Sequence, residues 1–388
     1  MASRRAADFC ERYTRDFTGA DFQRLFTRDT PEAYRFFTRG IDFDKLAREP
    51  WYRRWFIHAR LLFVAFTMRL SPARRVLYGV ALVLAALGMV RLFNGVGPTS
   101  ALLFPMTVTL YLPHWMPGTV SLFLGFLLVN LLILMEVADR LSLKSDLEIA
   151  RDIQLAMLPR GVKTAGDARI FGATRPANTV GGDFYDILPL ADGRVVVTVG
   201  DVAGKGSPAA LLMALLLAML RTLADEMLDP AKMIERLNVQ VARHSPASRF
   251  ITLFYGIYDP RDGSLEYVNA GHLPPIVFRG ATERDRLEGG GLALGMFHAA
   301  TYDSHRAIIQ PGNVLVLYSD GITKADNADG HAFEDAGLEG VIAHARDGDP
   351  EVLARALLAA VDAHAGDVRL ADDLTVLILS RANAVPVG

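Results

Sequence analysis

Cysteine is nearly absent from this chain, because Cys10 is the only one in 388 residues. A single cysteine excludes disulfide bonds within the chain and cysteine-rich zinc sites. Position 16, six residues on, is Asp16 rather than arginine, so a phosphatase loop with a cysteine nucleophile is not expected. Charge of one sign is lacking too, since the formal net charge is −2. No global field favours nucleic acid, and we expect no nucleic-acid partner.

Charge is also missing from two long apolar runs, at 76–90 and 119–135. With their flanking residues each can cover the ~30 Å hydrocarbon core of a membrane. We therefore predict a transmembrane region over 76–137, with spans at about 76–93 and 119–137. The segment 97–116 between them is apolar but interrupted by prolines. A third span, a re-entrant piece and a packed loop all remain open for it.

Basic residues outside these runs predict the topology. Arginines crowd the chain before Val76, and Arg140, Lys144 and Arg151 follow the second run. Because basic flanks stay in the cytoplasm, both flanks belong there, and we expect two spans in the cell inner membrane. Residues 1–75 form an Arg/Phe-rich cytoplasmic or interfacial segment. Its stretch 56–70 fits an interfacial amphipathic helix or a plain soluble helix.

A linker helix is predicted over 138–159, continuing from the last span. A stripe of residues recurs at spacings of 4, 3, 4 and 3 along it, all apolar except the glutamine: Leu143, Leu147, Ala150, Gln154 and Met157. Such a stripe is typical of a coiled coil, which would make the chain a homodimer through 138–159. An amphipathic helix docked on its own C-terminal domain is the alternative. Pro159 ends the helix in either case.

Residues 160–388 predict one globular domain that mixes helices and strands. The strand-like runs are 195–199, 250–258, 264–269, 275–278, 314–318 and 374–379. Strands and helices do not alternate strictly, which favours an α+β fold of antiparallel sheets over a doubly wound one. The apolar run 208–220 is too short to span a membrane and is predicted to be a buried core helix.

A hairpin places two acidic residues opposite one another. Ala191-Asp192-Gly193 fits a three-residue turn with glycine at the position of positive φ. If Leu190 pairs with Arg194, Asp183 lies opposite Asp201 on one face, where facing Cβ atoms are about 5 Å apart. Two carboxylates that close are unfavourable unless a cation lies between them.

Four short aspartate motifs recur in order along this domain. They are Gly181-Gly182-Asp183, Gly200-Asp201-Val202, Ser319-Asp320-Gly321 and Asp372-Asp373. Alone, each is most often a turn or a cap. Together they supply the oxygen ligands that hard divalent cations prefer. The sequence therefore predicts a metal-dependent hydrolase.

This combination resembles the metal-dependent serine/threonine protein phosphatases of type 2C, in the SpoIIE/RsbU-like branch, over about residues 145–381. Beyond the aspartates, the resemblance rests on the motifs at 150–159, 181–186, 200–206, 250–259, 269–275 and 291–297. It implies an α-β-β-α sandwich of two antiparallel sheets flanked by helices. It also implies hydrolysis by activated water without a phosphoenzyme. The implied substrate is a phosphoserine or phosphothreonine on a regulatory protein of the anti-anti-sigma type.

The resemblance implies two Mn²⁺ or Mg²⁺ ions as cofactors. Asp201 would bridge them, the Val202 carbonyl would add a ligand, and Asp320 and Asp372 would hold one ion. Asp183 would act on the ions directly or through water, and Asp373 joins the candidate ligands. The same four aspartates, 183, 201, 320 and 372, are the candidate catalytic residues.

Two positions depart from the resembled family, which usually has an acidic residue at Lys324 and often glycine at Glu334. Two other functions stay open. A membrane signalling scaffold with an inactive phosphatase domain is one. A nucleotide cyclase is the other, although it leaves Asp320 and the Asp372-Asp373 pair unexplained.

Overall fold

The computed structural model describes residues 57, 60, 63–64, 67–68, 70–93, 96–103, 106–113, 115–224, 226, 229–246, 249–279, 283–345 and 349–383. The predicted N-terminal segment 1–75, with the helix expected over 56–70, lies almost wholly outside these residues. The chain divides into two compact units, Met1–Leu141 and Ser142–Gly388. Each is described by itself.

The first unit contains two long apolar helices and a hairpin. Helix α5 (Pro72–Phe93) and the start of α6 (Trp115–Met157) contain the two predicted spans. Strands β1 (Val96–Leu103) and β2 (Met106–Pro113) lie between them and pair antiparallel, from Val96 with Pro113 to Leu103 with Met106. Within the open segment 97–116, the described residues up to Pro113 thus form a hairpin and not a third spanning helix, and Trp115 already begins α6.

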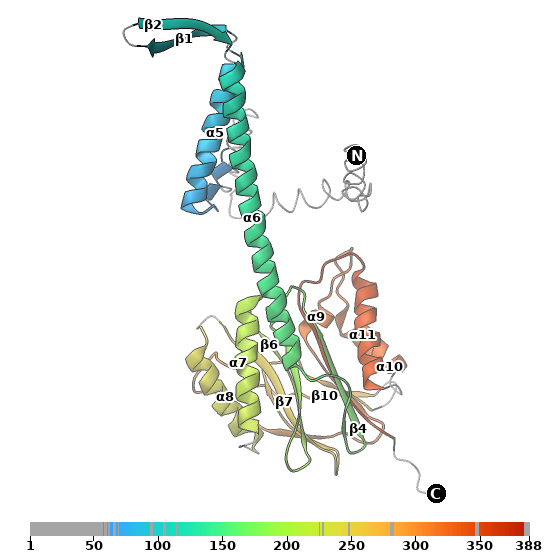
Figure 1. Ribbon diagram of the computed structural model, residues 1–388. Coiled ribbons are helices and arrows are strands. Elements are labelled where there is room, and N and C mark those ends of the chain that lie inside the picture. The colour runs from blue at the N-terminus through green and yellow to red at the C-terminus, as the bar shows by residue number, and fades with distance from the viewer. Residues whose placement is uncertain are drawn as a thin grey trace, which may run out of the picture. The chain divides into compact units, whose positions relative to one another are not determined.

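Small residues let α5 and α6 lie side by side (Figure 1). A Cβ added at Gly88 would be 2.8 Å from the Gly118 carbonyl oxygen, and one at Gly118 would be 3.1 Å from the Gly88 oxygen. Such close backbone contact between small residues is typical of helix pairs in membranes. At the far end of α5, Arg74 forms a 2.7 Å ion pair with Asp139 of α6.

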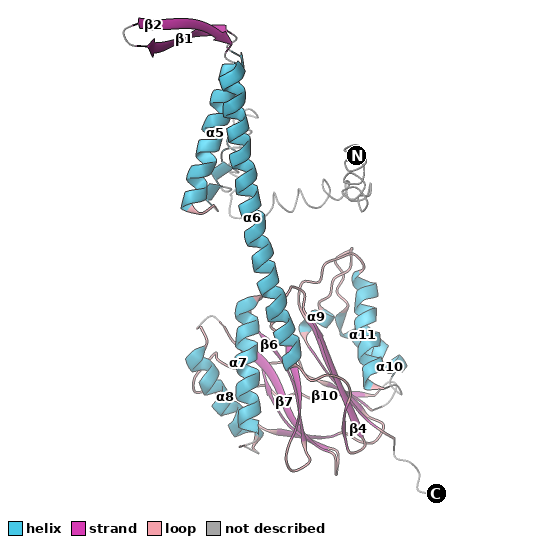
Figure 2. Ribbon diagram, in the orientation of Figure 1, coloured by secondary structure: helices cyan, strands magenta, loops and turns pink. Residues whose placement is uncertain are grey.

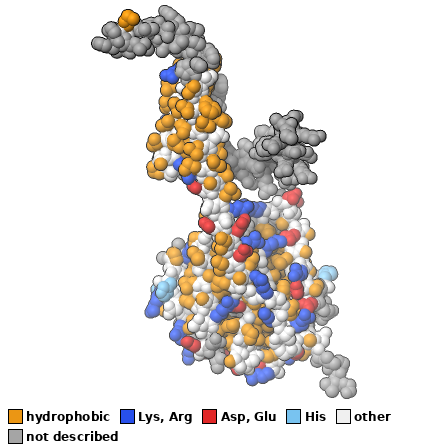
Figure 3. Space-filling model, viewed as in Figure 1, with side chains coloured by type: hydrophobic (Ala, Val, Ile, Leu, Met, Phe, Trp, Pro, Cys, Tyr) orange, Lys and Arg blue, Asp and Glu red, His pale blue; other side chains and the backbone are white. Residues whose placement is uncertain are grey.

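Three helices in the described residues are long and apolar enough to cross a membrane: Pro72–Phe93, Gly118–Met157 and Ser207–Ala224. Hydrophobic side chains gather over α5 and the adjoining part of α6 (Figure 3). The third helix, α7 (Ser207–Ala224), instead buries a full face that includes Met213, Leu216 and Leu220 in the core of the second unit. The prediction of a buried core helix over 208–220 is therefore confirmed.

The second unit is built on two antiparallel sheets (Figure 2). The five-stranded sheet runs β11 (His305–Ile308), β8 (Ser264–Ala270), β7 (Ile251–Asp259), β6 (Val195–Val202), β5 (Phe184–Pro189). The six-stranded sheet runs β10 (Arg284–Arg286), β9 (Ile276–Phe278), β12 (Val314–Tyr318), β13 (Leu374–Arg381), β4 (Ala168–Arg175), β3 (Lys163–Ala165). All six predicted strand runs are present.

Helices cover the outer faces of both sheets. Helices α7 and α8 (Pro230–His244) pack on the five-stranded sheet, whereas α10 (Glu334–Ala345) and α11 (Pro350–Ala365) lie on the six-stranded side. One apolar core fills the space between the sheets and under α7 and α8. A second lies between the six-stranded sheet and α10 and α11. The predicted α+β fold of antiparallel sheets is confirmed, and so is the α-β-β-α sandwich that the resemblance implies.

The last turns of α6 dock on this sandwich. The helix ends at Met157, two residues before Pro159, as predicted. Leu158 belongs to the core, and Gln154, which the sequence placed on a self-pairing stripe, is buried in its own domain. Leu143, farther back on the same stripe, is exposed. The docked alternative thus holds for the end of the helix.

Candidate metal centre

The four aspartate motifs lie at strand ends. Asp183 immediately precedes β5 and Asp201 is the penultimate residue of β6. Asp320 opens the one-turn helix α9 (Asp320–Thr323) just after β12, and Asp372 stands two residues before β13. Strands β5 and β6 are neighbours in one sheet, and β12 and β13 are neighbours in the other. Each sheet therefore brings two of the aspartates to one of its ends.

The predicted hairpin register is confirmed. Phe184 pairs with Gly200 and Pro189 with Val195, and the Leu190 N–H donates to the Arg194 carbonyl at 2.8 Å. Gly193 has φ 88°, the left-handed conformation that its turn position requires. This register puts Asp183 and Asp201 next to one another across the start of the ladder.

Gly182 allows a close approach between this strand start and the end of β6. A Cβ at Gly182 would be 2.8 Å from the Val202 carbonyl oxygen and 3.4 Å from Oδ1 of Asp201. Any larger residue would push these two oxygens away. The predicted ligands Asp201 and Val202 therefore face the Gly182 backbone together.

Asp373 holds the loop before β5 in place. Its carboxylate accepts hydrogen bonds from the backbone N–H groups of Ala177 (2.8 Å), Gly182 (2.7 Å) and Asp183 (3.4 Å). Its carbonyl accepts one from the Ser319 hydroxyl. Asp373 thus ties the Asp183 loop to the ends of β12 and β13. This structural role was not foreseen in the sequence, where Asp373 appeared only as a candidate ligand.

The carboxylates of Asp183 and Asp201 are held in unfavourable surroundings. Asp183 is 4% exposed, and its Oδ2 has no hydrogen-bond partner among the described residues. Burial, and then the charge of Asp201, raise the pKa of Asp183 well above its usual value. Burial, and then the charges of Asp320, Asp372 and Asp373, raise the pKa of Asp201 to about 6. A bound cation would reduce the repulsion between these carboxylates.

Two lysines reach the other two aspartates. Lys324 Nζ lies 2.7 Å from Oδ2 of Asp320, and Lys205 Nζ lies 3.2 Å from Oδ2 of Asp372. Lys205 also donates to the carbonyl of Ala371. Both lysine side chains are exposed, so their ammonium groups sit at the rim of the site rather than inside it.

This donor set suits hard divalent cations. In the part of the chain that the structure describes, no three His, Cys, Asp or Glu side chains converge as a ready ligand group. The charges of Asp320 and Asp372 nevertheless raise the pKa of Asp201, and the charge of Asp201 raises that of Asp183, whose buried Oδ2 lacks a donor. Carboxylate and carbonyl oxygens are the ligands of Mg²⁺ and Mn²⁺. The residues present therefore fit the ions that the resemblance implies.

His272 is held between two strands by both of its ring nitrogens. Its Nε2 lies 3.1 Å from the Tyr318 carbonyl, and its Nδ1 lies 3.0 Å from the hydroxyl of Thr252, the cross-strand partner of Asp201. Burial lowers the pKa of His272 to about 4. A neutral ring with both nitrogens engaged joins β7 to β12 and takes no proton at neutral pH.

Arg221 of α7 is a contact that the sequence did not reveal. Its Nε donates to Asp186 at 2.7 Å and its guanidinium also donates to the Met157 carbonyl at 2.6 Å. It therefore fastens the end of α6 to β5, three residues after Asp183.

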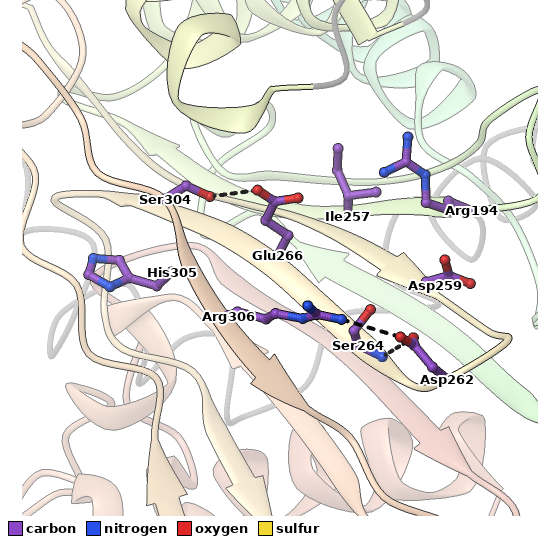
Figure 4. A pocket seen from close by; sticks show the side chains of 9 residues that line it. All are labelled: Arg194, Ile257, Asp259, Asp262, Ser264, Glu266, Ser304, His305 and Arg306. Atoms are coloured by element: carbon purple, nitrogen blue, oxygen red, sulfur yellow. Dashed lines mark hydrogen bonds and ion pairs between the residues drawn. The ribbon is translucent and has the colours of Figure 1, made fainter.

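A separate cavity of about 390 Å³ lies at the other end of the five-stranded sheet (Figure 4). Arg194 and Asp259 line it, and these stand at the start of β6 and the end of β7. At about 3.3 Å per residue, Arg194 is some 23 Å along β6 from Asp201. Charged side chains that line this cavity already have partners there, as in the Ser304–Glu266 hydrogen bond and the Arg306–Asp262 ion pair. The cavity is not part of the candidate metal centre.

Comparisons with known proteins find similarity in the second unit of the chain. Residues 191–382 match the family described as stage II sporulation protein E (SpoIIE). Protein IcfG of Synechocystis sp. is 30% identical over 224 residues, which cover 51% of this chain and 35% of IcfG. Phosphoserine phosphatase RsbU of Bacillus subtilis is 28% identical over 244 residues, which cover 62% of this chain and 71% of RsbU.

Among solved structures, the SiaA-PP2C domain of Pseudomonas aeruginosa is similar to 63% of this chain. The similarity covers 98% of that domain, with a TM-score of 0.54 and 26% identity. The matched part of this chain thus spans about a third of IcfG but nearly all of a PP2C domain. The resemblance of the C-terminal domain to the SpoIIE/RsbU-like branch of the type 2C phosphatases is confirmed.

Proposed function

We propose that this chain, whose residues 191–382 match the SpoIIE family, is a metal-dependent protein phosphatase acting on phosphoserine or phosphothreonine. The observation that carries the proposal is the gathering of Asp183, Asp201, Asp320 and Asp372 at the ends of four strands. Asp183 and Asp201 have raised pKa values, as expected for carboxylates of a metal site without its metal.

Asp201, the Val202 carbonyl, Asp320 and Asp372 are the residues proposed to hold two Mn²⁺ or Mg²⁺ ions. Such ions, when bound, activate water and neutralise the charge of a phosphate ester during hydrolysis. Asp183 assists from its buried position beside Asp201. Asp373 is also a candidate ligand, although its hydrogen bonds to three backbone N–H groups favour a positioning role.

The rim of the site suits a phosphorylated protein. Lys205 and Lys324 are exposed beside Asp372 and Asp320, and Arg249 donates to the Ala203 carbonyl next to the Asp201 loop. Such cations would attract a phosphate group to this rim. RsbU, one relative, is named a phosphoserine phosphatase. We propose a phosphorylated regulatory protein of the anti-anti-sigma type as the partner.

The chain is proposed to be anchored in the inner membrane by two spans. Helix α5 and the first part of α6 are apolar, long enough to span, and packed through Gly88 and Gly118. Basic residues flank both on their outer sides, so both termini and the catalytic domain belong in the cytoplasm. Reporter fusions at residues 20 and 145 test this. A reporter at residue 20 that is active only outside the cytoplasm contradicts the two-span topology.

A homodimer through 138–159 remains part of the proposal. Leu143 is 60% exposed on α6 and is available for pairing, whereas Gln154 is not. We expect Leu143→Glu to dissociate the dimer, because it puts a charge on the seam. Light scattering of the detergent-solubilised chain measures this. The same mass for wild type and variant, both monomeric or both dimeric, contradicts pairing through this seam.

The activity itself is tested on the full chain in detergent. Hydrolysis of p-nitrophenyl phosphate and of a phosphoserine protein should require Mn²⁺ or Mg²⁺ and stop with a chelator. Asp201→Asn and Asp320→Asn should each lower the rate by far more than tenfold, because lost ligands cost that much or more. Retention of over about a tenth of the activity in both variants would overturn the assignment. Absence of any metal-dependent hydrolysis in the wild type would favour the inactive scaffold.

A further inference from the structure

Lys324 forms an ion pair with Asp320, one of the proposed metal ligands. Its Nζ lies 2.7 Å from Oδ2 of Asp320, one helical turn earlier in α9 and its cap. Among the described residues, no other ion pair involves Asp320. The hydrogen bond to Asp320 and then the charges of Asp320, Asp372 and Asp201 raise the pKa of Lys324. One ammonium group therefore lies in the field of three candidate ligands.

A metal ion and this ammonium group need the same oxygen atoms. Mg²⁺ takes a carboxylate oxygen at about 2.0–2.1 Å. An ion bound so close to Asp320 would meet the positive charge of Lys324 a few ångströms away. The two cations repel, so one of them must move. The lysine is the movable one, because its side chain is 73% exposed on a flexible four-carbon stem.

We propose that Lys324 competes with the metal ion for Asp320, so that its charge lowers the metal affinity of this site and its ammonium group is displaced when the ion binds. This inference rests on the proposed function, because it takes Asp320 as a metal ligand. By this proposal, Lys324 raises the metal concentration at which the site is occupied. Affinity for divalent ions follows the charge placed around them.

The test is Mn²⁺ binding, which needs no turnover. Free Mn²⁺ is measured by electron paramagnetic resonance as it is titrated into the full chain in detergent. We expect Lys324→Gln to bind Mn²⁺ about tenfold more tightly than wild type, because it removes a positive charge, and Lys324→Glu more tightly still, because it also adds a negative one. The differences should shrink at high salt, where exposed charges are screened.

Lys144→Gln is the matched control. Lys144 is also an exposed lysine in an i,i+4 ion pair, with Glu148, and its side chain is 72% exposed. It lies on α6, away from the four aspartates in the sequence, and its removal should leave Mn²⁺ affinity unchanged. Circular dichroism of each variant checks that the fold is kept.

The outcomes separate this inference from the proposed function. Equal Mn²⁺ affinity in wild type and both Lys324 variants would overturn the competition while leaving the metal centre intact. Weaker Mn²⁺ binding in the variants would overturn it as well, because Lys324 would then favour metal binding. If neither wild type nor any variant binds Mn²⁺, both the competition and the metal-dependent function fail. Binding by the Lys324 variants alone would support competition in its strongest form.

Discussion

The side-chain amide of Gln154 forms two hydrogen bonds with the backbone of Gly181. Its Nε2 donates to the Gly181 carbonyl at 2.9 Å, and its Oε1 accepts from the Gly181 N–H at 3.2 Å. Gln154 lies on the last turn of α6, and Gly181 starts the loop that carries Asp183. The end of the linker helix is therefore bonded directly to the loop of the candidate metal centre.

Replacing Gln154 by alanine should lower both stability and activity. The change leaves a buried N–H and a buried carbonyl without partners, which costs about 1–3 kcal/mol in the free energy of unfolding. It also frees the loop that positions Asp183, so metal-dependent hydrolysis should fall with it. Urea unfolding and p-nitrophenyl phosphate turnover measure the two effects.

Gln154→Glu is the informative control, because it has nearly the same shape. Ionised, it keeps the acceptor for the Gly181 N–H but loses the donor to the Gly181 carbonyl. It should impair activity at least as much as alanine does, since it adds a negative charge near Asp183. Wild-type stability and turnover in both variants would show that the hydrogen bonds to Gly181 contribute to neither stability nor activity.

Asp201→Asn should stabilise the fold while it removes activity. Burial and neighbouring carboxylates raise the pKa of Asp201 to about 6, so its ionised form destabilises the folded state at pH 7 without metal. A neutral amide of the same shape should raise the free energy of unfolding by roughly 1–3 kcal/mol in the presence of a chelator.

The pH dependence gives the sign of this effect. A raised folded pKa means that the folded state binds more protons than the unfolded state between about 4 and 6. The stability that this group provides is present below about pH 4 and is lost as pH rises through 6. The advantage of Asp201→Asn over wild type should thus be largest at pH 7 and shrink towards pH 4. A constant difference across this range would exclude ionisation of Asp201 as the cause.

The fold followed from the sequence where local signals were strong. The turn at Asp192-Gly193 predicted a hairpin, and the register between β5 and β6 is the predicted one. Strand β4 was missed, because Gly172 interrupts its pattern and it pairs with β13, some 200 residues later. Short edge strands such as β10 carry too few residues to show a period.

The candidate site followed only in part. Its four aspartate motifs were visible, but the two carboxylates of Asp372-Asp373 look alike in a sequence. The backbone N–H groups that bond to Asp373 come from 177–183, far away along the chain. Gln154 looked like one member of an apolar stripe, although a polar side chain at such a position was the available sign of a buried partner.

Asp372→Asn and Asp373→Asn should have different effects. Asp373 accepts three backbone N–H bonds, so its amide variant should lower the melting temperature by several degrees, because one oxygen is replaced by a donor. Asp372 instead faces Lys205 at the rim and is partly exposed. Its amide variant should weaken Mn²⁺ binding with little change in melting temperature. Weaker Mn²⁺ binding in Asp373→Asn without loss of stability would instead make Asp373 a ligand.

Glu334→Gly should stabilise the protein, because Glu334 has φ 60°, the left-handed conformation that glycine adopts without strain. The resembled family often has glycine at this position, which opens α10. A side chain in this conformation costs roughly 1–2 kcal/mol, and glycine gives back part of that gain through the greater freedom of the unfolded chain. We expect a net increase of about 0.5–1 kcal/mol in the free energy of unfolding, measured by urea titration. Glu334→Ala is the control, since it removes the carboxylate but keeps the Cβ that causes the strain. Equal stabilisation by alanine and glycine would trace the effect to the lost charge rather than to the backbone.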